Sequence, residues 1–138
     1  MVSGIGIDSI EIERFSQWAD YPHDKLAKTF SKTEIAYCLS NKQKSAERFA
    51  ARFAVREALF KALSQALPGN SIPFFTVCQN ICVSKESNGN PILQVNWENI
   101  LTHYDKKPIT GFRTLVSITH TKKVATAIVL CDNIHGDI

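Results

Sequence analysis

Apolar residues between Arg48 and Leu63 recur with the spacing of a helix. The segment R-F-A-A-R-F-A-V-R-E-A-L-F-K-A-L contains neither Gly nor Pro, which favours a helix. At about 100° per residue, Phe49, Phe53 and Phe60 fall on one stripe, and alanines cover most of the remaining surface. A helix that is apolar on most sides is typical of the centre of a fold. We therefore expect the rest of the chain to pack around this segment.

Four charged residues interrupt this apolar helix: Arg52, Arg56, Glu57 and Lys61. Glu57 and Lys61 are four positions apart and so share a face, with alanines beside them. Charges on a buried helix are costly unless they are paired or used for binding. Two interpretations stay open: an ion pair between Glu57 and Lys61 with solvated arginines, or a binding site on a floor of methyl groups.

The alternation of apolar residues from position 2 predicts a short opening strand. In such a strand Gly4, Gly6 and Asp8 share one face, which is nearly bare and allows a helix to pack closely. The alanine face of the central helix is the natural partner, and this packing brings Asp8 near Glu57. The alternative is that D-S-I-E is a capping box, with Asp8 as the N-cap of a helix over residues 10–18.

The remaining chain divides into further helices and strands. We expect a helical turn over residues 25–30, a helix from the capping box at Ser31 to about Leu39, and a central helix that Ser45 could cap and that ends near Leu67, before Pro-Gly. Asn88-Gly89 predicts a hairpin turn. A short helix is expected over residues 97–104. Four further strands are predicted: 72–83, 91–96, 115–119 and 124–131. Without repeats or linkers, residues 1–138 are expected to form one α+β domain, an antiparallel sheet packed around a long central helix.

Composition narrows the class of protein. The chain has 138 residues, of which 44% are hydrophobic and 21% charged, as in soluble globular proteins. No apolar run is long enough to span a membrane, and the N-terminus lacks the features of a signal peptide. The four cysteines lack zinc-site spacing, so a reducing, cytoplasmic location is the simplest expectation.

The net charge is +3, which allows an acidic partner or a phosphorylated ligand without requiring one. The chain contains no aromatic–basic pattern of the kind that reads RNA, so we expect no nucleic-acid partner and no membrane partner. It also lacks a Gly-rich phosphate loop and a local Ser/His/Asp signature.

Two carboxylates from different elements, Asp8 and Glu57, suit Mg²⁺, which takes one or two carboxylates and completes its octahedron with waters and substrate phosphates. Positive charge for a phosphorylated ligand would come from six residues: Lys44, Arg52, Arg56, Lys61, His120 and Lys122. The Thr-His-Thr-Lys connection at positions 119–122 also offers backbone N–H groups for an anion. The alternative for His120 is a solvated loop histidine.

Several motifs together resemble the 4′-phosphopantetheinyl transferases. Gly6-Ile7-Asp8 and the segment F-A-V-R-E-A-L-F-K at positions 53–61 look like the two-part signature of that family. The short length, S-I-T-H-T at positions 117–121 and N-G-N-P at positions 88–91 are similar to its holo-acyl-carrier-protein synthase branch. The resemblance covers nearly the whole chain, and its motifs are specific in combination.

This resemblance implies a reaction and a set of roles. Such enzymes transfer the phosphopantetheine arm of coenzyme A to a serine of an apo acyl carrier protein and release adenosine 3′,5′-bisphosphate. By similarity, Asp8 and Glu57 would hold Mg²⁺ and Lys61 would contact the phosphates. Arg52, His120 and Thr121 would contact the nucleotide end, where Lys44 adds charge, and Arg14 would face the carrier protein. The branch typically forms a homotrimer with sites between subunits.

The chain departs from the family pattern at Arg56, where lysine is most common. This change is tolerable if the role of the residue is charge alone. Two other functions stay open: a metal-dependent hydrolase of nucleotides or phosphate esters, and a non-catalytic oligomeric module. In that module Arg52, Arg56, Glu57 and Lys61 would form a structural ion network.

Overall fold

The computed structural model describes residues 1–106 and 109–133. Its strands are β1 (Val2–Glu11), β2 (Ile81–Lys85), β3 (Pro91–Val95), β4 (Arg113–His120) and β5 (Val124–Asp132). Its α-helices are α1 (His23–Leu26), α2 (Lys32–Leu39), α3 (Ser45–Ala66), α4 (Phe74–Gln79) and α5 (Trp97–Leu101), and its 3₁₀ turns are η1 (Ile12–Phe15), η2 (Trp18–Asp20) and η3 (Lys42–Lys44).

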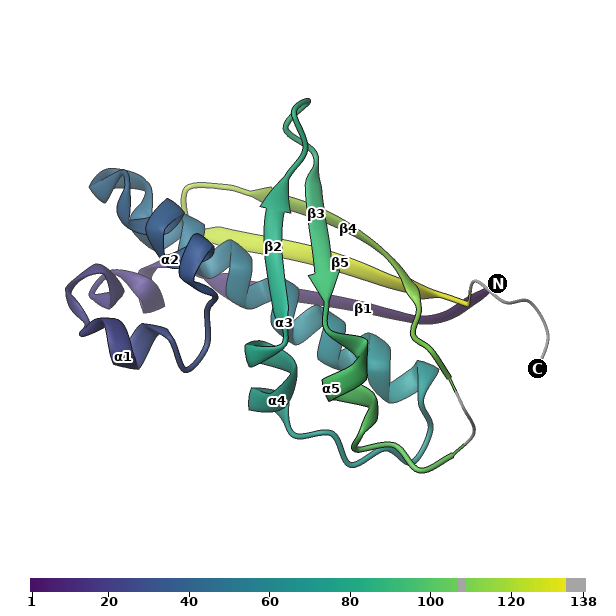
Figure 1. Cartoon of the computed structure of the whole chain (residues 1–138). Helices are drawn as coiled ribbons and strands as arrows, with labels where there is room; N and C mark the ends of the chain where they lie inside the picture. The colour runs from purple at the N-terminus through teal and green to yellow at the C-terminus, as the bar shows by residue number, and fades with distance from the viewer. Residues whose placement is uncertain (107–108, 134–138) are drawn as a thin grey trace.

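The long helix α3 crosses the molecule, and an antiparallel sheet of order β1-β5-β4 lies along it (Figure 1). The hairpin β2–β3 is a separate antiparallel pair whose tip projects away from α3 (Figure 1). This is the predicted α+β arrangement of an antiparallel sheet packed around a long central helix. Phe49, Ala54 and Leu59 on α3 are fully buried, so the core lies where the alanine-rich pattern placed it.

The glycines of β1 allow the strand to pack closely against α3. A Cβ atom on Gly4 would collide with the carbonyl oxygen of Ala62, and one on Gly6 with that of Ala58. The expected approach of a bare strand face to the alanines of the helix is therefore confirmed. This approach also brings Asp8, on the same strand face, against α3.

Asp8 does not cap a helix. Strand β1 continues through Glu11, which pairs with Val124 of β5, so Asp8 lies within the strand. The expected helix over residues 10–18 is wrong, because the segment forms the two short 3₁₀ turns η1 and η2 instead. Long-range pairing with β5 overrides the local capping signal.

The expected strand over residues 72–83 is also wrong in its first half. Pro73 precedes the short helix α4, and β2 begins at Ile81. Phe74 packs edge-on against Phe53 and Phe60 of α3, with ring centroids 5.8 and 5.4 Å apart. These tertiary contacts override the local preference of aromatic and β-branched residues for strands.

Most other predicted boundaries agree with the structure. The capping box of Ser31 and Glu34 is present at the start of α2, and Gly89 adopts a φ of 87° in the hairpin turn. Helix α3 ends at Ala66, next to the predicted Leu67. It begins at Ser45, but the Ser45 hydroxyl does not cap it. In the described part of the chain, no helix is long and apolar enough to cross a membrane.

Candidate functional site

Asp8 and Lys61 come together where β1 crosses α3. Lys61 Nζ donates hydrogen bonds to Asp8 Oδ1 at 3.1 Å and to the carbonyl oxygen of Ile7 at 2.9 Å. Among the described residues, Glu57 forms no ion pair with Lys61 at salt-bridge distance. The simple pair of Glu57 and Lys61 along the helix is therefore not what the structure contains, and Lys61 neutralises the strand carboxylate instead.

Glu57 is the second carboxylate of this cluster. Partial burial raises the pKa of Glu57, and the negative charge of Asp8 raises it further, against the opposing effects of Lys61 and Arg14. Asp8 is thus near enough to Glu57 for their charges to repel, as the sequence predicted. Arg14, an exposed residue of η1, lies within electrostatic reach of the same carboxylate.

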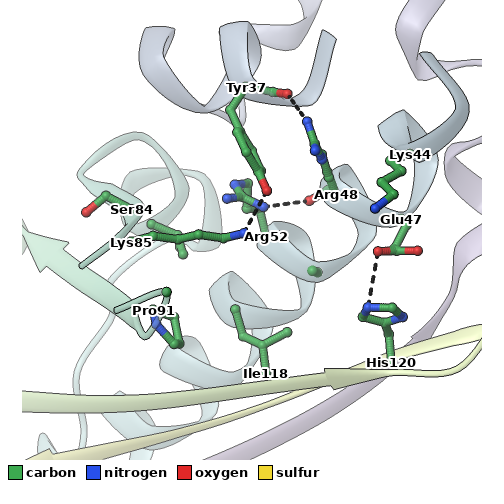
Figure 2. A pocket seen from close by; sticks show the side chains of 13 residues that line it. Tyr37, Lys44, Glu47, Arg48, Arg52, Ser84, Lys85, Pro91, Ile118 and His120 are labelled. Atoms are coloured by element: carbon green, nitrogen blue, oxygen red, sulfur yellow. Dashed lines mark hydrogen bonds and ion pairs between the residues drawn. The ribbon is translucent and has the colours of Figure 1, made fainter. Parts of the chain in front are cut away.

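A basic cavity of about 340 Å³ opens near the N-terminal part of α3 (Figure 2). Five basic side chains line it: Lys44, Arg48, Arg52, Lys85 and His120. Tyr37 and Glu47 add an aromatic ring and one carboxylate, and the hairpin contributes Gly89 and Pro91. The volume is at the lower end of the range of about 300–1,000 Å³ found for small-molecule sites. This lining can bind a compact anion attached to an apolar or aromatic group.

Arg52 is the most buried cation of the cavity, with 6% of its surface exposed. Its Nη1 donates to the carbonyl oxygen of Arg48 at 3.3 Å, but its buried Nε has no acceptor among the described residues. A buried guanidinium with unused donors is costly unless an anion completes its hydrogen bonds. An anion bound in the cavity would supply an acceptor for this guanidinium.

His120 ends β4 and enters the same cavity (Figure 2). Its Nε2 lies 3.1 Å from Glu47 Oε1, so it is paired rather than simply solvated. Thr121 is placed differently: its hydroxyl accepts hydrogen bonds from the backbone of Lys123 and Val124, both at 3.1 Å, and orders the β4–β5 turn. Lys44 lines the cavity as the sequence reasoning suggested.

The predicted site residues thus form two groups rather than one. The first group is Asp8, Glu57 and Lys61, and the second is Lys44, Arg52 and His120. Lys61 is nine positions after Arg52 on the helix, which corresponds to about 14 Å of rise and about two and a half turns, so the two side chains leave opposite faces. The lining of the basic cavity includes none of the first group.

Arg56 belongs to neither group, and its expected role in phosphate binding is wrong. Its guanidinium is fully buried and binds both carboxylate oxygens of Glu34, at 2.7 and 2.8 Å. It also donates to the carbonyl oxygens of Thr29 and Cys78 at 2.8 and 3.2 Å. Arg56 therefore joins α2, α4 and the segment before α2 to the central helix.

The described chain offers no buried reactive thiol. Burial raises the pKa of Cys38, Cys78 and Cys131 to about 12, so all three stay protonated near neutral pH. None of the four cysteines is in a disulfide. These three thiols are therefore not candidate nucleophiles.

A sequence profile described as the 4′-phosphopantetheinyl transferase superfamily matches residues 4–128. The chain belongs to this superfamily. The matched segment contains both groups of site residues, from Asp8 to Thr121, and leaves only the ends of the chain outside.

Curated members of the superfamily resemble the chain along nearly its whole length. The holo-[acyl-carrier-protein] synthase of Treponema denticola is 32% identical over 134 residues, which cover 96% of this chain and 99% of the relative. The enzyme of the same name from Clostridium acetobutylicum is 33% identical over 132 residues, covering 92% and 94%.

Solved structures of the superfamily have the same fold. A holo-(acyl-carrier-protein) synthase from Bacillus anthracis, in complex with CoA (3′,5′-ADP), has a TM-score of 0.72 and 28% identity and covers 96% of this chain and 98% of its own. The ACPS–CoA complex of Chronobacterium ammoniagenes has a TM-score of 0.74 and 26% identity, covering 94% and 96%.

A divalent ion of the kind that the transferase resemblance implies fits the first group of residues. Glu57 and Asp8 repel each other, as the raised pKa of Glu57 indicates, and a dication between them would relieve this repulsion. Among the described residues, no cluster of three or more His, Cys, Asp or Glu side chains could hold a metal by protein groups alone. Asp8 and Glu57 would therefore hold Mg²⁺ together with ligand oxygens and water.

Sequence reasoning missed several residues of the basic cavity: Tyr37, Glu47, Arg48 and Lys85. One signal was available, because Arg48 and Arg52 are four positions apart on one helix face, with Lys44 four positions before Arg48. Tyr37 and Lys85 had no such signal, since α2 and β2 reach the cavity through tertiary packing.

Proposed function

We propose that this protein is a holo-acyl-carrier-protein synthase. It would transfer 4′-phosphopantetheine from coenzyme A to a serine of an apo acyl carrier protein, with Mg²⁺, and release adenosine 3′,5′-bisphosphate for fatty acid biosynthesis. The observation that carries this proposal is the meeting of Asp8, from the Gly-Ile-Asp strand, with Glu57 and Lys61 of α3. The near full-length similarity to enzymes of this name supports it.

The basic cavity would take the nucleotide end of coenzyme A. Arg52 has an unpaired donor, and Lys44 and His120 line the same cavity, so a phosphate there would meet several cations. The complex of the Bacillus anthracis enzyme with CoA (3′,5′-ADP) supports this choice of ligand. Thr121 would act indirectly, because its hydroxyl orders the turn that follows His120.

In the reaction, the serine oxygen attacks the pyrophosphate phosphorus that bears the pantetheine arm. The new O–P bond forms as the bridging P–O bond breaks, and the bisphosphate leaves with the bonding electrons. Lys61 would contact the phosphate oxygens. Glu57, or a water that it orients, is our candidate base for the serine proton. Bound Mg²⁺ would neutralise charge on the pyrophosphate.

The two groups of site residues would meet between subunits of a homotrimer. The outer face of the β1-β5-β4 sheet is apolar and has no covering element in the described chain: Ile5, Leu130 and Leu115 stand side by side across it, followed by Ile7 and Ile128. An exposed apolar face of this kind marks an interaction surface. A second copy seated there could place its basic cavity beside Asp8 and Glu57, which one chain alone does not do.

Arg14 would contact the carrier protein. The reacting serine has to reach the Asp8–Glu57 cluster, and Arg14 is an exposed cation whose charge acts on Glu57. An acidic carrier is attracted to such a residue. We also propose that residues 1–138 form a single transferase domain. Its four cysteines are free, which supports a cytoplasmic location.

The test is the intact mass of a purified apo acyl carrier protein after incubation with this protein, coenzyme A and Mg²⁺. We expect a mass gain of one phosphopantetheine that a chelator abolishes. Asp8→Ala and Glu57→Ala should each abolish the gain while circular dichroism stays unchanged. Near-normal rates in both variants would refute the two-carboxylate site.

The same mixture without carrier protein tests the alternative of a metal-dependent hydrolase. That function requires turnover of coenzyme A by water at saturating Mg²⁺, whereas a transferase requires the carrier. The non-catalytic alternative depends on an ion network of Arg52, Arg56, Glu57 and Lys61. The observed ion pairs argue against this network, because Arg56 pairs with Glu34 and Lys61 with Asp8.

A further inference from the structure

Tyr37 stands at the point where three cations of the basic cavity converge (Figure 2). The guanidinium carbons of Arg48 and Arg52 lie 4.0 and 4.4 Å from the centre of its ring. Its hydroxyl oxygen lies 2.7 Å from Lys85 Nζ, which donates to it. Two arginines from α3 and a lysine from β2 therefore share one side chain of α2.

The contacts of Tyr37 hold these cations in a fixed geometry. An aromatic face attracts guanidinium groups, and a phenol oxygen accepts a hydrogen bond from an ammonium group. Arg48 is fixed further by hydrogen bonds from Nη1 to the carbonyl oxygen of Tyr37 at 2.8 Å and to Ser40 Oγ at 3.0 Å. The hydrogen bond from Lys85 lowers the pKa of Tyr37, as expected for a strongly accepting phenol.

Lys85 needs such an anchor more than the arginines do. It is exposed and ends the first strand of a hairpin whose tip projects from the molecule (Figure 1). Lysine side chains carry large rotamer entropy, so an unanchored Lys85 would contribute little to a phosphate site. Its bond to Tyr37 connects the hairpin to α2 and keeps the ammonium on the cavity wall.

Tyr37 and Lys85 also line a second hollow of about 220 Å³, which includes Thr33 and the carboxylate residue Glu34. The two hollows share five lining residues, Tyr37, Arg52, Val83, Ser84 and Lys85, so the bond between Tyr37 and Lys85 belongs to the wall between them.

We propose that Tyr37 is a positioning residue for the phosphate of the nucleotide, because it holds Arg48, Arg52 and Lys85 in one array on the cavity wall. This inference rests on the proposed function, in which the cavity takes the nucleotide end of coenzyme A. Tyr37 does not touch the reacting atoms. Its effect is therefore on the affinity for the nucleotide and not on the rate of the chemical step.

Two substitutions separate the contributions of the hydroxyl and the ring. Tyr37→Phe keeps the ring under both arginines and removes the anchor of Lys85, so 3′,5′-ADP should bind about three- to tenfold more weakly. Tyr37→Leu removes the ring as well, and binding should weaken by about thirtyfold or more. The matched control is Tyr21→Phe, because Lys25 lies 3.8 Å from the ring centre of Tyr21, outside the cavity.

The experiment is titration calorimetry of 3′,5′-ADP into wild type and the three variants, with thermal melts to verify folding. Steady-state kinetics with coenzyme A and apo carrier protein accompany it. We expect the affinity for 3′,5′-ADP to be equal in wild type and Tyr21→Phe, lower in Tyr37→Phe and lowest in Tyr37→Leu. We also expect the loss to fall on KM for coenzyme A, with kcat unchanged.

The possible failures are distinguishable. If wild type binds 3′,5′-ADP and folded Tyr37→Phe binds it equally well, the positioning role is wrong while the proposed function stands. A fall in kcat at constant KM also overturns the role. If wild type itself does not bind 3′,5′-ADP or coenzyme A, the proposed function fails and the inference fails with it.

Discussion

Lys61 Nζ lies 3.1 Å from Asp8 Oδ1, and this contact joins the central helix to the opening strand at the carboxylate cluster. The lysine side chain is 52% exposed and the aspartate side chain 17%. Exposed ion pairs of this kind contribute little to stability, about 1 kcal/mol or less. The contact therefore matters for the charge that it places beside the predicted site of the pyrophosphate.

Lys61→Met should reduce kcat/KM for transfer by about a hundredfold, because a cation aimed at developing phosphate charge is lost. The melting temperature should change little, since the pair is exposed. The Mg²⁺ concentration for half-maximal rate should not rise, because the carboxylates remain. A large rise would instead assign Lys61 to the organisation of the metal site. The control is Lys28→Met, an exposed lysine of the segment after α1.

Glu57→Gln should stabilise the metal-free protein while it abolishes transfer. Partial burial and the charge of Asp8 raise the folded pKa of Glu57, so the favourable contribution of this group is full below its unfolded pKa and is lost as pH rises through the folded pKa. At neutral pH the ionised carboxylate therefore costs stability, and the neutral amide does not.

Thermal melts in a chelator at pH 7 and at about pH 4, below the usual glutamate pKa, test this prediction. The variant should melt a few degrees above wild type at pH 7, and the difference should vanish at the lower pH. A variant that melts below wild type at pH 7 would show that Lys61 and Arg14 outweigh the repulsion from Asp8.

The sequence predicted what depends on local periodicity. The alanine and phenylalanine spacing of α3 and the glycine face of β1 were sufficient to bring Asp8 near Glu57. What it missed depends on contacts between distant segments. The strand signal at Phe74 was overridden by ring packing on α3, and the cavity role of Tyr37 required three elements to converge.

Arg56 illustrates the same limit, because its partner Glu34 is 22 positions away and nothing in the local pattern of either residue identifies the other. Charge alone would have permitted a lysine at this position. The structure instead requires a planar fork, since two guanidinium nitrogens bind the two oxygens of one carboxylate.

Arg56→Lys should therefore destabilise the protein by about 1–3 kcal/mol, because hydrogen bonds of the fork are lost inside the core. Arg113→Lys is the matched control: it also removes a 2.7 Å arginine–carboxylate contact, with Asp132, but at a side chain 62% exposed. Its cost should be near zero. If urea denaturation gave the same loss of unfolding free energy for both variants, burial would not decide how much these ion pairs contribute to stability.

The same pair predicts a pH dependence. Burial alone would raise the pKa of Glu34, but the hydrogen bonds and charge of Arg56 outweigh burial and lower it. The stabilisation is present above the unfolded pKa of the carboxyl group and is lost as pH falls through the lower folded pKa. The difference between wild type and Arg56→Lys should accordingly shrink in strongly acidic solution.

Ile7→Lys should break the proposed trimer without unfolding the subunit. Ile7 is 58% exposed on the edge strand β1, within the apolar outer face of the sheet, so a lysine there is tolerated in a monomer and costly in an interface. Light scattering should show a smaller species, with transfer reduced at least about tenfold. Phe75→Lys is the control, since Phe75 is also 58% exposed but lies on α4. Equal assembly of both variants would place the interface elsewhere.

If each site is built from two subunits, defects in its two halves should complement each other. Asp8→Ala removes a carboxylate of the first group, and Arg52→Ala removes the buried cation of the cavity. Each variant alone should be inactive. In a co-expressed mixture, some interfaces join the intact carboxylates of one variant to the intact cavity of the other, and these sites should be active. With equal amounts of the two variants and random assembly, about a quarter of the sites are of this kind, so about a quarter of wild-type activity should return. If the site lies within one chain, every chain carries a defect and the mixture stays inactive.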